Sequence, residues 1–204
     1  LYIAYESKSS FFLLAIENSY KELASVLLNS MVKELELLKL KELNDRIDQL
    51  DSNGNNILHL ALKNDNIEMI EKLVKLGANI NCQDSNGRTI FHLACANGNR
   101  KILEKLMKLG SDINKLDAKN NNPLSLALKG EYEEVIIFLL KQDKLSDISE
   151  ENITLLCNLM FKNKNIDLVK EFTNLILTKN YLLKSVNKDN KSTLMSLLIK
   201  KGLD

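Results

Sequence analysis

The histidines and cysteines are the residues of this chain whose types and spacing could support catalysis or metal binding. Cys95 lies three residues after His92, so a helix would place the thiol and the imidazole on one face as a nucleophile and its base. A cysteine within a segment of small residues behaves equally well as a small hydrophobic group. No C-x-x-C pair is present, and an odd number of cysteines is typical of free thiols in a reducing compartment. We expect free thiols at Cys82, Cys95 and Cys157, and neither a metal site nor a cofactor.

The acidic residues and the glycines indicate turns rather than catalysis. Asp51, Asp84 and Asp117 recur at a constant interval, and each is predicted to open a β-turn through its side chain. The seven glycines are spread over the chain, so no Gly-rich phosphate loop is present. We therefore expect no catalytic residues and no enzymatic activity.

Composition excludes several classes of binding protein. The chain of 204 residues is 45% hydrophobic and 27% charged, which is ordinary for a soluble folded protein. A net charge of +1 argues against nucleic-acid binding, whose affinity comes from neutralised phosphates. The longest apolar runs, 11–16 and 135–140, fall far short of the roughly 20 residues that cross a membrane. We expect a cytoplasmic protein without membrane insertion.

A 33-residue period organises the middle of the chain. The segment DSNGNNILHLA at 51–61 returns as DSNGRTIFHLA at 84–94 and as DAKNNNPLSLA at 117–127. Within one unit, apolar residues over 57–62 predict a short helix, and a stripe over 67–74 predicts a second one. Neither helix is long enough to be stable alone in water. Each unit is therefore predicted to bury its apolar stripe against a neighbouring copy.

This repeat resembles that of the ankyrin-repeat family, whose pattern is D-x-x-G-x-T-P-L-H-x-A, a turn, a second helix and G-A-D/N-x-N. The unit 84–116 follows the pattern most closely. The resemblance implies an all-α solenoid of paired antiparallel helices with β-turn fingers, in which His59 and His92 join neighbouring turns by hydrogen bonds. The other two units depart from the pattern with Asn56 for Thr, Ile57 for Pro, Asn120 for Gly and Ser125 for His.

The resemblance also predicts how the chain is divided. Thr154 is expected to open a fourth unit with Cys157 at the histidine position, followed by a second helix over 166–175. Because the chain starts at Leu1 rather than Met, we expect a fragment of a longer protein. The expected regions are degenerate N-terminal ankyrin-like or capping helices over 1–50, three regular repeats over 51–149 (51–83, 84–116 and 117–149), and degenerate C-terminal repeats over 150–204.

The family implies a protein-binding scaffold whose partners contact the turn tips and the exposed end of each first helix. The corresponding positions are mostly small, neutral and polar with scattered positive charge, which suits an acidic or polar segment of a partner protein. We expect the chain to be a monomer. The positions carried over are Ser52, Asn53, Asn55, Lys63, Asn64, Ser85, Asn86, Arg88, Ala96, Asn97, Ala118, Lys119, Asn121 and Lys129.

Alternatives to this interpretation stay open. The chain could be the substrate-targeting module of a larger enzyme or effector whose catalytic domain lies outside it, or 31–51 and 142–192 could enclose a small ligand. The surface positions could also be solvated turn residues, since few residues of an interface carry its energy. Abundant Lys and Asn beside 3 Arg are typical of AT-rich coding sequence. A secreted effector from such a genome would act in the cytosol of a host cell.

Overall fold

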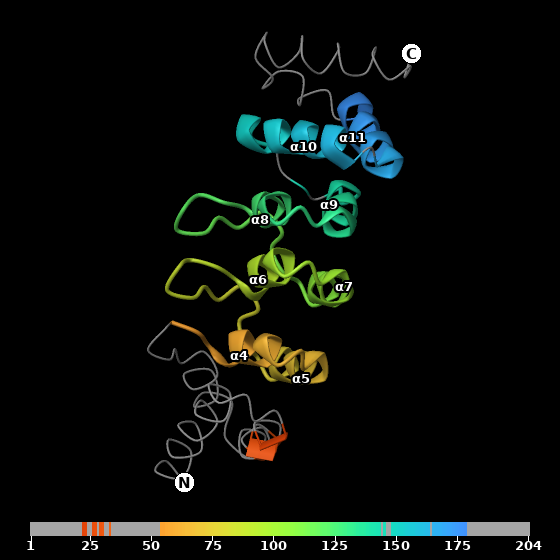
Figure 1. Cartoon of the computed structure of the whole chain (residues 1–204). Helices are drawn as coiled ribbons and strands as arrows, with labels where there is room; N and C mark the ends of the chain where they lie inside the picture. Colours follow the sequence, from red (N-terminus) through yellow and green to blue (C-terminus); the bar gives the residue numbers. More distant parts are fainter. Residues whose placement is uncertain are drawn as a thin grey trace. The chain divides into compact units, whose positions relative to one another are not determined.

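The structure of the chain is a computed structural model that describes residues 54–178, apart from 144, 146, 147 and 164, and also residues 22, 23, 26, 27, 29, 30 and 33. Within 54–178 the described residues form the helices α4 to α11 and no β-strand (Figure 1). The fold is therefore the predicted all-α fold of paired helices. The predictions for the ends of the chain, and the predicted surface residues Ser52 and Asn53, lie outside the described residues.

The chain forms two compact units. Helices α6 (Ile90–Ala96) and α7 (Arg100–Lys108) contribute residues to both units. Unit 1 consists of Leu1–Phe91, Glu104–Asp112 and Asp117–Lys119, and unit 2 consists of His92–Leu103, Ile113–Leu116 and Asn120–Asp204.

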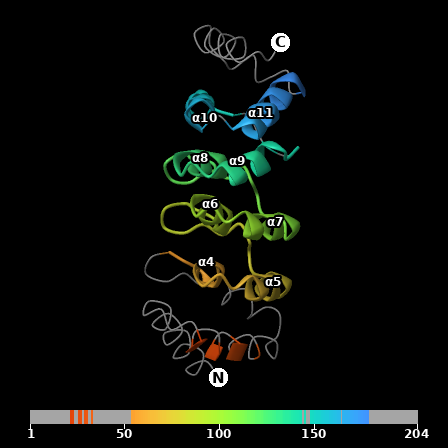
Figure 2. The same ribbon diagram turned by 45° about the vertical axis from the view of Figure 1, so that its right-hand side comes forward.

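Unit 1 contains the helix pair α4 (Ile57–Lys63) and α5 (Ile67–Lys75), which pack against each other (Figures 1 and 2). The side chain of Asn56 starts α4 by accepting hydrogen bonds from the backbone N–H groups of Leu58 and His59, at 3.0 and 3.1 Å. Asn66 caps α5 in the same way through the N–H of Met69, at 3.1 Å. Because only three residues join the helices, they run back along each other and bury their apolar faces together.

The turn before α6 is a hydrogen-bonded finger, which we define as residues 84–88 (Figure 1). The N–H of Asp84 donates to the carbonyl of Arg88 at 2.8 Å, and the Asp84 carboxylate accepts from the N–H groups of Asn86 and Arg88, at 2.9 and 2.8 Å. The N–H of Ala118, in the turn before α8, donates to the carbonyl of Asn86 at 2.9 Å. The prediction that Asp84 opens a β-turn is confirmed, and the two turns are linked through their backbones.

Unit 2 contains α8 (Pro123–Lys129), α9 (Glu133–Leu140), α10 (Glu150–Asn163) and α11 (Ile166–Thr178). Helix α8 packs against α9 and α10, and α9 packs against α11. Asn122 caps α8 through the N–H of Ser125 at 2.9 Å, and Pro123 occupies the first turn, where its missing N–H costs nothing. Buried side chains from all four helices, including Leu124, Leu139 and Phe172, form the core of this unit.

Helix α10 begins earlier than the sequence predicted. It starts at Glu150, four residues before Thr154, because the hydroxyl of Ser149 accepts a hydrogen bond from the N–H of Asn152 at 3.3 Å and caps the helix there. The predicted start of the second helix at Ile166 is confirmed. No helix of the described residues is long and apolar enough to cross a membrane.

Two glycines of unit 1 have the same kind of backbone conformation but differ in how closely other atoms approach them. Both have positive φ, +72° at Gly87 and +93° at Gly110. A Cβ at position 87 would lie 2.6 Å from the backbone nitrogen of Ala118, whereas a Cβ at position 110 would have no atom within 4 Å. Gly110→Ala should lower the free energy of unfolding by about 1–2 kcal/mol through backbone strain. Gly87→Ala should lower it by about a further 1–3 kcal/mol, because the turns must separate.

Urea denaturation of the two variants and the parent chain measures this difference. Equal losses for both variants would show that the turns of unit 1 do not approach as closely as described.

Candidate protein-binding surface

The two histidines hold turns in place. His59 is 2% exposed, and its Nε2 donates a hydrogen bond to the carbonyl oxygen of Arg88 at 3.0 Å, within unit 1. His92 is fully buried, and its Nε2 lies 3.3 Å from the carbonyl oxygen of Asn121, within unit 2. Each imidazole therefore satisfies a carbonyl of a turn 29 residues further along the chain. The structural role implied for the histidines is confirmed.

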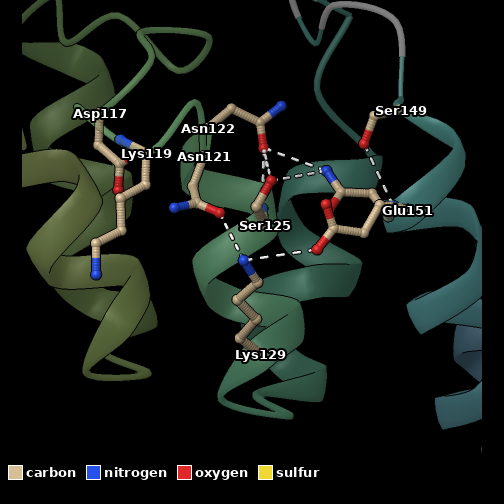
Figure 3. Close-up of polar contacts among 9 residues, drawn as sticks. Asp117, Lys119, Asn121, Asn122, Ser125, Lys129, Ser149 and Glu151 are labelled. Carbon is tan, nitrogen blue, oxygen red and sulfur yellow. Dashed lines mark hydrogen bonds and ion pairs between the residues drawn. The ribbon is translucent and has the colours of Figure 1, made fainter.

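The repeat at 117–149 has Ser125 in place of this histidine, and here the later helix, α10, supplies the hydrogen-bond donor. The Ser125 hydroxyl donates to Oδ1 of Asn122 at 2.8 Å (Figure 3). Asn152, only 2% exposed, donates from Nδ2 to the Ser125 hydroxyl at 2.8 Å. As the third residue of α10, Asn152 occupies the position that was predicted for Cys157. That prediction is wrong because α10 is capped at Ser149, which places Cys157 in the middle of the helix.

The thiols are poorly suited to nucleophilic chemistry. Cys95 has no exposed surface, and burial raises the pKa of its thiol far above the usual range, which keeps it protonated. Burial also raises the pKa of Cys157, from 9.0 to about 11. His92, the conceivable base for Cys95, uses its Nε2 on a backbone carbonyl. Among the described residues, no group of three His, Cys, Asp or Glu side chains could hold a metal ion.

The predicted surface residues divide between the two units. In unit 1 they lie on the turn tips and at the end of α4, and we call this set the finger surface. Lys63, Ser85, Asn86, Ala118 and Lys119 are exposed there, and the other three are half-buried. The finger surface consists of Asn55, Lys63, Asn64, Ser85, Asn86, Arg88, Ala118 and Lys119.

Two residues of the finger surface have structural contacts of their own. Nε and Nη2 of Arg88 both lie 3.1 Å from Oδ2 of Asp84. The side-chain amide of Asn64 donates to the carbonyl of Leu60 at 3.0 Å and closes the end of α4. Their side chains therefore shape the turn and the helix end before any partner is present.

The predicted surface residues of unit 2 are Ala96, Asn97, Asn121 and Lys129. Asn97 and Lys129 are exposed, and Ala96 and Asn121 are half-buried. Nζ of Lys129 lies 2.6 Å from Oδ1 of Asn121 and 3.7 Å from a carboxylate oxygen of Glu151 (Figure 3). Glu151 was not predicted from the sequence, because its place beside Lys129 follows from the start of α10 at Glu150 rather than at Thr154.

The Asn152–Ser125 hydrogen bond can be measured by a double-mutant cycle. Ser125→Ala and Asn152→Ala should each lower the free energy of unfolding, and the double variant should lose about 1 kcal/mol less than their sum because the same bond is lost only once. Urea denaturation gives the coupling energy. In a control cycle of Ser125→Ala with Asn97→Ala, a change of an exposed residue, the losses should add. Additive losses for Ser125 and Asn152 as well would contradict the bond.

Burial of Cys157 should make the fold less stable as the pH rises into the alkaline range. The pKa of its thiol is about 11 in the folded chain and 9.0 without burial, so the unfolded chain loses this proton first. The contribution of the neutral thiol is fully present below pH 9 and is lost as the pH rises through about 11. Urea denaturation should show that the parent chain loses more stability than Cys157→Ala between these pH values. Parallel pH profiles would contradict burial of this thiol.

Comparison with known families agrees with this geometry. The family model for ankyrin repeats (3 copies) matches residues 76–152, and the model for ankyrin repeats (many copies) matches residues 43–90. Together the two matches cover more than half of the chain. No curated protein matches the sequence. The paired helices, the hydrogen-bonded fingers and these matches show that the chain belongs to the ankyrin-repeat family.

Proposed function

We propose that the chain is a protein-binding module that holds a segment of a partner protein against the finger surface of unit 1. Ankyrin repeats are generally modules of protein–protein interaction, and residues 43–152 match them. The observation that carries the proposal is the set of exposed side chains on turns whose backbones are already fixed by hydrogen bonds.

The rigidity of the turns supports this function. The carboxylate of Asp84 holds the N–H groups of Asn86 and Arg88, and the carbonyl of Asn86 is held in turn by the N–H of Ala118. Side chains on such turns lose little backbone entropy when a partner binds, and affinity is therefore gained through preorganisation.

The exposed tips give room for contact. Asn86, Ala118 and Lys119 are exposed, and the side chains of Asn86 and Ala118 make the tips short and neutral. A segment of a partner could therefore lie close to the backbone of both turns. Because Ala118 is exposed, a longer side chain at this position would separate that segment from the turn.

A variant of the finger surface tests the proposal. Asn86→Ala combined with Ala118→Gln removes one amide and adds bulk at the next tip without changing the charge. Proteins captured by the parent chain should bind this double variant about tenfold more weakly, as expected when one or two central contacts of an interface are lost. Affinity is measured by surface plasmon resonance with each captured protein.

The matched control is Lys75→Gln with Lys108→Gln, which changes two exposed residues of unit 1 at the ends of α5 and α7. Binding should stay within about twofold of the parent. Full binding by the Asn86 and Ala118 variant, with unchanged circular dichroism, would remove the finger surface as the binding site.

A further inference from the structure

We infer that the segment bound by the finger surface carries little net charge and is recognised through hydrogen bonds, not through attraction of an acidic sequence to lysines. This inference rests on the proposed function, because it concerns the partner of the same surface. It follows from how the charges of unit 1 are arranged around the turn tips.

The arginine of the finger surface is already neutralised. Nε and Nη2 of Arg88 both contact Oδ2 of Asp84 at 3.1 Å, and the Asp84 side chain is only 3% exposed. The same carboxylate holds the backbone of the finger through its Oδ1. A carboxylate of a partner would therefore have to compete with Asp84 for Arg88. Asp84 cannot move away without loss of the hydrogen bonds that shape the turn.

The two lysines of the finger surface each have a carboxylate two residues away. Lys63 is followed by the exposed Asp65, and Lys119 is preceded by Asp117, whose Oδ1 accepts a hydrogen bond from the N–H of Lys119 at 2.8 Å. The three cations of the finger surface are thus matched in number by Asp65, Asp84 and Asp117, which lie within four residues of them in the sequence. The summed charge of these segments is zero, so they offer little net attraction to a charged segment of a partner.

The tips also carry uncharged polar side chains. The exposed Asn86 side chain can both donate and accept hydrogen bonds, and Asn55 and Ser85 are likewise polar and uncharged. The exposed methyl group of Ala118 adds no charge. Such a surface fits the peptide groups and the Ser, Thr, Asn or Gln side chains of an uncharged segment.

A selection of peptides tests the inference. A phage-displayed library of random linear peptides is selected on the immobilised parent chain and depleted on the Asn86→Ala and Ala118→Gln double variant, which leaves peptides that need the finger surface. The affinities of the recovered peptides are then measured at about 0.05 M and about 0.5 M salt, since screening at the higher ionic strength removes attraction between exposed charges.

The recovered peptides should have a mean net charge near zero, and their affinities should change by less than about twofold between the two salt concentrations. Lys63→Gln with Lys119→Gln should weaken them no more than the matched Lys75→Gln with Lys108→Gln. Peptides rich in Asp and Glu, with affinity that falls about tenfold in high salt and in the Lys63 and Lys119 variant, would overturn the inference and leave the proposed function intact. Recovery of no peptide that needs the finger surface would overturn both.

Discussion

The fold depends on a hydrogen bond between a buried polar residue in the third position of one helix and the turn before a later one. Helix α4 has seven residues, fewer than an isolated helix needs in water, so its stability comes from packing. The carbonyl of Arg88 already accepts a hydrogen bond from the N–H of Asp84 at 2.8 Å, which closes the finger at 84–88. The buried His59 donates a second hydrogen bond to the same carbonyl at 3.0 Å and so joins α4 to the finger. This bond satisfies a buried imidazole N–H and fixes the position of the turn relative to α4.

The repeat at 117–149 shows that a buried polar contact at this position matters more than the residue type that makes it. Ser125 occupies the histidine position of α8, and its hydroxyl reaches only its own cap, Asn122. Asn152 of α10 completes the link by donating back to Ser125 at 2.8 Å. In the earlier repeat the first helix donates to the later turn, whereas here the later helix, α10, donates back to α8. The donor is an amide instead of an imidazole, but a buried polar contact is kept. Loss of the histidine is therefore compatible with the fold where the following helix supplies a side chain of sufficient length.

Most of the fold could be predicted from the sequence, because the spacing of apolar residues and the repeated turn residues act over short stretches of chain. Apolar residues over 57–62 and over 67–74 predicted α4 and α5, and the structure adds that Asn56 and Asn66 cap these helices. The start of α10 was missed because Thr154-Leu-Leu-Cys157 imitates the helix signature, whereas the decisive cap, Ser149, lies in an irregular connection. Asn120 stands where the repeat has glycine, and its φ of +59° shows that asparagine can adopt the same left-handed turn.

The surface was less predictable than the fold because exposure alone does not decide whether a side chain is available to a partner. Lys129 and Lys63 look alike in the sequence, yet Lys129 lies beside Asn121 and Glu151, a pairing that depends on where α10 begins. Arg88 is fixed by the aspartate that also builds its turn. Asp84 thus both shapes the finger and neutralises Arg88. The exposed side chain of Asn86 lies on the same turn and carries no charge, which agrees with the inferred recognition of an uncharged segment.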